Sequence, residues 1–417
     1  MDEEKKNNFF ESVKSEPSFL IMCLITLVYT LSAGALWFIL PIIAQRFVTG
    51  IETIGLVLSI PYAFAFLLSI PCGALSDRIG RKTVGIIGLV IVFVLGYFIK
   101  NIDSIDIFYL VIILLGLSIS LISSPARAYI MDLTPRGLSA EYFGIFISAM
   151  YLGLALGPIF TGFYMDSSIE IGTEFVSRIT MGTGIIGILL FTFIRETVNK
   201  PQPLLYGLRN LLLEDRIVTK AFSQFSELKK LGGVILLLTV LFAITDGFIW
   251  ALEPLYYTSL KLNSSTGSII FSMFYLPLII FSLPAGYIAD KYGVINGLKI
   301  GLIISGTALI IFGFSNSVAV LIVCSFITSI GFAFSWASLS GWITSISREG
   351  SRGNITGVWN MAIEFGYMSG PIIGGLIAGC AGIGHSFSIQ GGLLLISVIL
   401  IEYLRRGYLR ENELNHC

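Results

Sequence analysis

The sequence predicts an all-α membrane protein, with twelve transmembrane helices in two six-helix bundles related by pseudo-twofold symmetry. Three observations predict this fold: the composition, the number of apolar segments and an internal repeat. The 417 residues are 55% hydrophobic and only 12% charged, with a mean hydropathy of +0.87. Soluble domains carry about twice that share of charged residues. Lipid must therefore replace water over most of the surface.

The same composition excludes several classes of function. The 26 basic and 26 acidic residues balance, so no basic field for nucleic acid exists. The cysteines are scattered and odd in number, which argues against a disulfide framework, and two distant histidines do not make a zinc site. We see no phosphate-binding loop and no catalytic constellation. We therefore expect neither an ATP-driven pump nor an enzyme, and no cofactor or metal.

Twelve apolar segments are long enough to cross a membrane, for which a helix needs about 20 residues. The seventh and eleventh are each interrupted by one acid, Asp246 and Glu364. Two long runs each hold two helices, because turn-forming residues divide them near 313–317 and 382–385. The predicted spans are 17–45, 53–76, 83–99, 107–126, 142–165, 174–194, 231–252 and 262–289, followed by the pairs within 300–347 and 353–401.

The distribution of lysine and arginine predicts the orientation of these spans. With the N-terminus inside, 22 basic residues fall on the inner side and only Arg46, Lys100, Arg178 and Lys261 on the outer side. Cytoplasmic loops carry such an excess. We expect a multi-pass protein of the cell membrane with a cytoplasmic N-terminal segment (1–17) and tail (407–417). The first apolar run is too long for a signal peptide and is expected to stay as a span.

The two halves of the chain align at a constant offset of 213 residues. Rare residues stay in register across it, for example Trp37 with Trp250 and Pro158 with Pro371. Residues 18–196 and 231–406 are thus predicted to be two parallel copies, with a binding site between them at the midplane of the membrane. The linker, 197–230, is predicted to contain a surface amphipathic helix from the spacing of Leu204, Leu205, Leu208, Leu211 and Leu212.

The loop between the second and third spans carries a specific motif, which consists of Gly73, Asp77, Arg78, Gly80, Arg81 and Lys82. A shortened copy, Gly286, Asp290 and Gly293, follows in the second half without the trailing basic pair. In these motifs and in its repeat the chain resembles the major facilitator superfamily, essentially over its whole length.

The resemblance implies a gating role for this loop. Asp77 would face the start of helix 11, where a carboxylate gains about 0.3–1 kcal/mol from the helix dipole. Arg81 would face the acid that closes helix 4, here Asp132. These contacts would stabilise the outward-facing state. The alternative is that the basic cluster only fixes the topology.

Helix 5 carries glycines at helical spacing and a Gly-Pro step, which can bend a helix. The pattern resembles the antiporter motif of drug/proton exporters and favours export. Two departures are Thr161, where a glycine is usual, and Ile112 in helix 4, where such exporters often have an arginine. The alternative is that these glycines serve only the packing between the two halves, since Gly374 and Gly375 repeat the pattern in helix 11. The residues of the helix 5 motif are Gly144, Gly153, Gly157, Pro158 and Gly162.

Acids within membrane spans are costly and indicate function. Asp246, Glu253 and Glu364 are the candidates for proton coupling, because buried carboxyls can titrate near neutral pH. Each acid also has an alternative to proton coupling. For Asp246 it is a structural hydrogen bond between helices, and for Glu253 a position at the membrane interface. Glu364 fits a coupling role and a structural role equally.

Aromatic and hydroxyl residues are the candidates for lining a substrate cavity. The resemblance places helices 1, 4, 7 and 10 around the cavity, and the candidates on them are Tyr29, Trp37, Ser120, Ser123, Trp250 and Trp336. For the tryptophans, a belt at the membrane interface is the alternative.

These features predict a monomeric secondary transporter of a small hydrophobic or amphipathic solute, coupled to protons and directed outward. Proton-coupled uptake, metabolite or sugar export, and a membrane sensor without transport are the alternatives.

Overall fold

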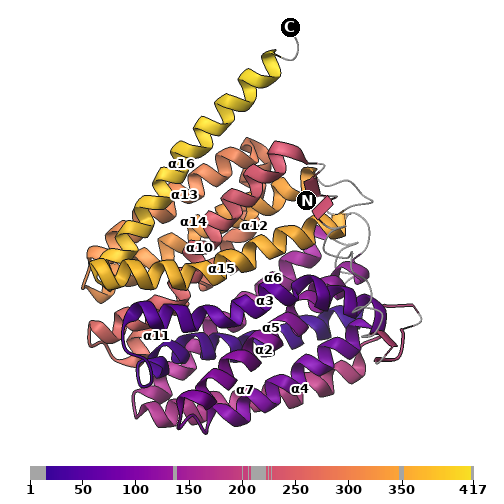
Figure 1. Cartoon of the computed structure of the whole chain (residues 1–417), viewed down its shortest axis with the longest axis vertical. Helices are drawn as coiled ribbons and strands as arrows, with labels where there is room; N and C mark the ends of the chain where they lie inside the picture. Colours follow the sequence, from indigo (N-terminus) through magenta and orange to yellow (C-terminus); the bar gives the residue numbers. More distant parts are fainter. Residues whose placement is uncertain are drawn as a thin grey trace.

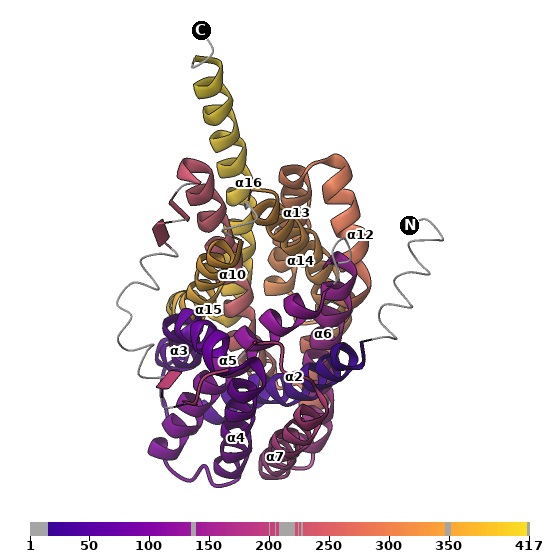
Figure 2. The ribbon, with the colours of Figure 1, turned by 90° about the vertical axis from the view of Figure 1, so that its right-hand side faces the viewer.

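The computed structural model describes residues 16–134, 139–199, 201–204, 206–207, 222–223, 225–226, 228–346 and 352–414. Twelve segments of the described chain are long and apolar enough to cross a membrane. They form two bundles, seen one below the other in Figure 1 and from the side in Figure 2. The predicted twelve-helix fold is confirmed.

Each bundle contains six membrane-crossing segments. The N-terminal bundle consists of α2 (Pro17–Ala44), α3 (Ile51–Ile79), α4 (Arg81–Ile99), α5 (Ile105–Leu133), α6 (Ser139–Met165) and α7 (Ile169–Phe193). The C-terminal bundle consists of α10 (Lys229–Ser259), α11 (Ser264–Ser272), α12 (Leu276–Tyr292), α13 (Val294–Phe314), α14 (Val318–Ile346), α15 (Arg352–Ala381) and α16 (Ile383–Leu414). We call the end at which α2 begins the inner end and the opposite end the outer end.

Each of the two long apolar segments is divided into two helices at the predicted place. A break separates α13 from α14 at 315–317, and Gly382, with a φ of +90°, separates α15 from α16. The linker helix stays a prediction, because Leu205, Leu208, Leu211 and Leu212 lie outside the described residues. The last turns of α16 extend beyond the bundle in Figures 1 and 2.

The eighth span is interrupted, which the sequence analysis did not predict. It consists of α11 and α12, separated by Met273, Phe274 and Tyr275. Pro277 explains the interruption, because proline has no N–H to bond to the carbonyl of Met273. The amide of Leu278 instead bonds to the carbonyl of Tyr275.

Two antiparallel helix pairs join the bundles, and the 213-residue offset relates one pair to the other. In the first pair, α3 packs against α15; in the second, α11 and α12 pack against α6. Glycines permit close approach at the outer end: Gly55 lies against the carbonyl of Pro371, and Gly375 against the backbone of Ile51. We call the surface along which these bundles meet the seam.

Hydrogen bonds reinforce the outer half of the seam on the second pair. The Ser272 hydroxyl donates to the carbonyl of Ala155 at 2.7 Å, and the amide of Ser265 donates to Asp166 at 3.0 Å. With the glycine contacts of the first pair, these bonds close the outer end. The molecule is therefore closed toward the side on which loop α2–α3 lies.

Candidate functional site

Asp246 lies at the centre of the seam, on the face of α10 that is turned toward the N-terminal bundle. The residue is 8% exposed, and both carboxylate oxygens accept a hydrogen bond. Trp250 Nε1 donates to Oδ1 at 3.0 Å, and the Tyr367 hydroxyl donates to Oδ2 at 3.0 Å. Since Tyr367 belongs to α15, the carboxylate joins two helices of the C-terminal bundle next to the seam.

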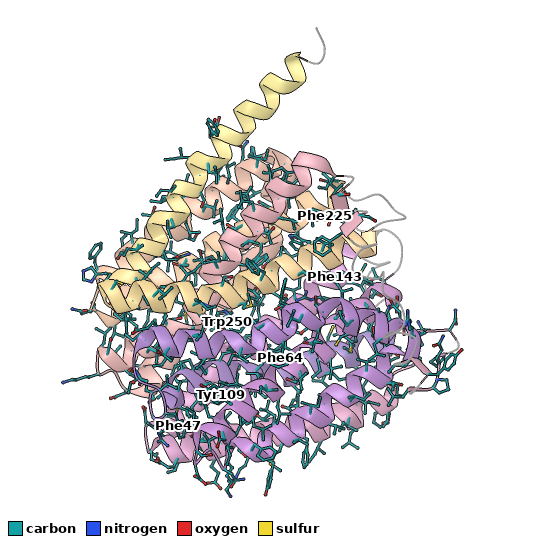
Figure 3. All side chains as sticks on the ribbon, in the orientation of Figure 1. Phe47, Phe64, Tyr109, Phe143, Phe225 and Trp250 are labelled. Atoms are coloured by element: carbon teal, nitrogen blue, oxygen red, sulfur yellow. The ribbon has the colours of Figure 1, made fainter. Side chains whose placement is uncertain are left out.

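Five aromatic side chains from both bundles surround this carboxylate. Trp250 lies edge-on to Trp37 of α2, with ring centroids 4.8 Å apart, and Trp37 stacks on Tyr62 of α3 at 4.9 Å. Tyr62 in turn lies 5.2 Å from Tyr367, and Tyr275 lies 5.9 Å from Trp250. Such offset and edge contacts are favourable between aromatic rings. We call Trp37, Tyr62, Trp250, Tyr275 and Tyr367 the aromatic cluster; Figure 3 labels Trp250 where the bundles meet.

The structure thus brings together Trp37, Trp250 and Asp246 of the predicted residues. Trp336 of α14 lies at the edge of the cluster, with its ring 6.5 Å from that of Tyr367. Neither Trp37 nor Trp250 is in an interfacial belt, because Trp37 is 5% exposed and Trp250 is enclosed by other rings.

The remaining cavity candidates lie within the N-terminal bundle. Tyr29 packs in an apolar core of that bundle, and its hydroxyl has no partner among the described residues. The hydroxyl of Ser120 donates to the carbonyl of Gly116 at 3.0 Å, within its own helix. Ser123 is partly buried on the same helix. Contact of these three residues with a substrate stays a prediction.

Sequence reasoning missed the three tyrosines of the cluster. Tyr62 and Tyr275 are 213 residues apart and are therefore a repeat pair, but the sequence analysis did not name them as site residues. Tyr367 has no aromatic counterpart at Leu154. None of the three tyrosines is on the first, fourth, seventh or tenth span, which were the spans predicted to surround the cavity.

Glu253 and Glu364 are also buried. Glu253 is 0% exposed, and neither carboxyl oxygen has a hydrogen-bond partner among the described residues. Its side chain is thus enclosed by protein in this conformation, and its role as a proton-coupling or an interfacial acid stays a prediction. Glu364, on α15, is 8% exposed, and its Oε2 has no described partner. One turn before it, Asn360 accepts a hydrogen bond of 2.9 Å from Arg127 of α5 across the seam.

The loop motif forms a compact network at the inner end of the N-terminal bundle. Arg81 Nε lies 3.3 Å from Asp132 Oδ2, the contact that the resemblance implied. Arg81 also pairs with Asp77, whose side chain is 61% exposed. Asp77 is therefore not buried against another helix end in this conformation. Contacts with the first side chains of α15 lie outside the described residues, as does the side chain of Asp290.

Glu196 completes this network and was not singled out from the sequence. Its carboxylate accepts hydrogen bonds from the amides of Arg81 at 3.0 Å and Lys82 at 3.1 Å, the first two residues of α4. An acid at a helix N-terminus is stabilised by the helix dipole. Gly80 makes this approach possible with a φ of +103°.

Lys82 contacts the C-terminal end of a helix, α7. Its Nζ donates to the carbonyls of Thr192 and Ile194, where α7 ends, at 3.3 and 3.1 Å. A cation is favoured at that terminus. At the end of α3, Gly73 lies against Ser124, and the carbonyl of Arg78 accepts from the amide of Gln202 at 2.8 Å. The motif thus ties α3, α4, α5 and α7 together.

The glycines of helix 5, now α6, are packing positions. Gly153 and Gly157 lie against the backbone of α2, and Pro158 is in contact with Gly34 of that helix. Gly162 lies against Ser268 of α11, across the seam, and Gly144 is near Leu283 of α12. The motif therefore serves close packing both within its bundle and between bundles. Its role as an antiporter motif stays a prediction.

Comparison with known proteins decides the family. The family model described as Major Facilitator Superfamily matches residues 22–234 and again 235–415. The chain belongs to the major facilitator superfamily. It is thus a membrane transporter by family and not an enzyme. The family model matches the chain twice, once in each half, which agrees with the two bundles.

Several curated relatives are similar over most of the chain. The multidrug resistance protein MdtG of Salmonella arizonae is 27% identical over 353 residues, which cover 83% of each chain. An uncharacterized MFS-type transporter of Bacillus subtilis, YqjV, is 22% identical over 84% of each chain. An uncharacterized MFS-type transporter of Methanocaldococcus jannaschii is 27% identical over 179 residues, so this chain spans only 46% of that relative's length.

Solved structures share the fold of this superfamily member. A bacterial homologue of the human lysosomal transporter Spinster, in an inward-facing and unoccupied conformation, has a TM-score of 0.75 at 15% identity, over 94% of this chain and 97% of that chain. The nucleoside transporter NupG, in a mutant form, has a TM-score of 0.73 at 15% identity, over 93% of this chain and 99% of that chain.

Proposed function

We propose that the protein is a secondary active transporter that exports a small hydrophobic or amphipathic solute in exchange for protons. The observation that carries this proposal is the position of Asp246. It is a buried carboxylate at the seam, surrounded by aromatic rings from both bundles. Rings offer apolar contact area, and the carboxylate offers a polar anchor, which together suit an amphipathic solute.

The arrangement of the seam supports alternating access. Two symmetry-related helix pairs, α3 with α15 and α6 with α11, close the outer end. In transporters built from parallel repeats, rocking of one bundle against the other exposes a fixed site to each side in turn. The solute would bind among the aromatic cluster and Asp246, with Trp336 at the edge.

Other aspects of the proposal rest on the sequence and on relatives. The excess of basic residues on the inner side supports cytoplasmic termini and insertion in the cell membrane. Similarity to a multidrug resistance protein supports outward transport of an amphipathic solute. Burial of Asp246, Glu253 and Glu364 supports proton coupling. A buried carboxyl is costly in its charged form, so it can bind a proton in one conformation and release it in another. A single chain contains both bundles, which supports a monomer.

Transport by the purified full chain in lipid vesicles tests the proposal. Vesicles are loaded with ethidium, and a pH gradient is imposed across the membrane. We expect the gradient to accelerate dye movement, a protonophore to abolish the acceleration, and protein-free vesicles to show none. Movement of dye in the same direction as the protons would support uptake and contradict export. A rate unaffected by the gradient would contradict proton coupling.

A further inference from the structure

The N-terminus of α11 is capped by a residue of the other bundle. Asp166, which follows the last residue of α6, accepts a hydrogen bond of 3.0 Å from the amide of Ser265, the second residue of α11. A capping side chain normally belongs to the residue just before a helix and bonds to the second or third amide of that helix. Asp166 therefore takes the place of an N-cap side chain, although α6 and α11 belong to different bundles.

The residue that precedes α11 could cap the helix but does not. Asn263 is in the N-cap position, and asparagine is among the residues that cap helices best. Its side chain is exposed and makes no capping hydrogen bond in this conformation. The first turn of α11 thus has two candidate acceptors, Asp166 from across the seam and Asn263 from its own loop.

We propose that Asp166 and Asn263 alternate as the cap of α11, and that this exchange latches the outer end of the molecule. Asp166 caps the helix while the outer end is closed, and Asn263 caps it when the bundles separate there. This inference rests on the alternating access of the proposed function, but it does not depend on which solute or ion is carried.

Close packing of α6 on α11 places Asp166 within reach of the helix. A Cβ on Gly162 would lie 2.6 Å from the carbonyl oxygen of Ser264 and 2.5 Å from the Cβ of Ser268, so a larger residue would prevent this approach. Asp166 lies one helical turn after Gly162, and its amide bonds to the carbonyl of Gly162 at 3.1 Å. The contact between bundles therefore sets the position of the carboxylate, and separation of the bundles removes it from α11.

Charge favours the cap that is present in the closed state. The N-terminus of a helix carries partial positive charge, so a carboxylate stabilises it more than a neutral amide side chain does. The first turn of α11 contains no acid of its own, and Asp166 has no ion-pair partner within the described part of the chain. Because Asn263 can replace the bond that is lost on opening, the two states differ only by the difference between the two caps. The latch is therefore reversible.

The other helix pair of the seam has no equivalent carboxylate. The 213-residue offset relates Asp166 to Gly379, which has no side chain, and Ser265 to Glu52. Glu52 is an acid in the first turn of α3 itself and stays with that helix whether the bundles are together or apart. Only the pair of α6 with α11 thus has a helix terminus that obtains its acid on closing and loses it on opening.

Distances between spin labels in the purified full chain test the exchange. The labels are placed at the exposed outer positions Lys100 and Asn316, one on each bundle, and Cys380 and Cys417 are replaced by serine. Separation of the bundles at the outer end lengthens the distance between the labels. The fraction of molecules with the longer distance therefore measures how often the outer end is open.

Variants of the two capping residues distinguish the exchange from a general loss of packing. Asp166→Ala removes the cap of the closed state, so the fraction with the longer distance should rise at least threefold. Asn263→Ala removes the cap of the open state, so adding it to Asp166→Ala should lower this fraction again. A weakened outer end without an exchange of caps would not close again in the double variant. Asp103→Ala, at an exposed acid of the outer α4–α5 loop, is the matched control and should leave the distances unchanged.

An unchanged distribution in Asp166→Ala overturns the proposal, and so does a double variant that is as open as Asp166→Ala or more open. The measurement needs neither solute nor pH gradient. If vesicles exchange dye for protons but Asp166→Ala stays closed, the proposed function stands and this inference fails. If the distances follow the two caps but no dye is exchanged for protons, the inference stands and the proposed function fails.

Discussion

Arg127 of α5 donates a hydrogen bond of 2.9 Å to Asn360 of α15 and so connects the two bundles across the seam. It lies inward of the aromatic cluster, and no other side chain-to-side chain hydrogen bond joins the bundles within the described residues. Arg127 has no carboxylate within 4.0 Å among those residues, although Glu364 is one turn from Asn360. Within the part of the chain that the structure describes, this cation therefore has no ion-pair partner.

We predict that Arg127→Gln weakens the contact between bundles on the inner side of the site. Hydrogen bonds to charged groups contribute about 1.5–3 kcal/mol, so the population of separated bundles should rise by about tenfold or more. Spin labels on the inner ends of the bundles would report this change as a broader distance distribution. Arg178→Gln, at a 75% exposed arginine of the outer end, is the matched control and should leave the distribution unchanged. An unchanged distribution in Arg127→Gln would show that the bond does not hold the bundles together.

Tyr367→Phe removes a donor from Asp246 and keeps the ring. Loss of one hydrogen bond to a buried carboxylate costs about 1–3 kcal/mol, so we expect dye transport to fall by about tenfold. Tyr256→Phe removes a hydroxyl that bonds to the carbonyl of Ser315, away from the site, and serves as control. Initial rates in vesicles would measure both. Equal rates for the two variants would contradict a role for Tyr367 in the site.

Gly157→Ala should destabilise the N-terminal bundle. The added Cβ would collide with the carbonyl of Leu31 on α2, which is backbone and cannot rotate away. Such overpacking costs about 1–3 kcal/mol. The matched control is Gly182→Ala, where nothing lies within 4 Å of the added atom. Thermal unfolding in detergent should show a lower midpoint for the first variant alone.

Glu196→Gln should weaken the inner end of the N-terminal bundle. The carboxylate accepts from two amides at the start of α4, and loss of its charge removes a helix-dipole interaction of about 0.3–2 kcal/mol. We expect a small decrease in the unfolding temperature that becomes smaller at high salt, because salt screens such interactions. Asp103→Asn, at an exposed outer-loop acid whose side chain has no hydrogen bond or ion pair among the described residues, should have no comparable effect. A decrease that is independent of salt would contradict the electrostatic explanation.

Much of the fold followed from the sequence, because the repeat constrains it strongly. The offset that pairs Gly162 with Gly375 also relates the two helix pairs of the seam. Apolar length and turn residues located the spans, since both are local properties of the chain. The start of the sixth span was placed five residues late, at Glu174 instead of Ile169, because its charges hid its first turn.

The site was less accessible to sequence reasoning. A buried acid in a membrane span is conspicuous, so Asp246, Glu253 and Glu364 were found. Tyr62, Tyr275 and Tyr367 were not, because a tyrosine at a membrane interface and one at a bundle seam have the same sequence signal. Which atoms donate to Asp246 depends on how α15 rotates against α10, and that rotation is set by the packing of the whole bundle.

The interruption between α11 and α12 makes the two halves of the molecule mechanically unequal. Its counterpart in the first repeat, around Tyr62, lies in an unbroken helix, α3. A missing rung in the backbone ladder lowers the stiffness of a helix. The eighth span can therefore bend beside Tyr275, whereas α3 stays one continuous helix although Pro61 also leaves one of its carbonyls without an amide partner.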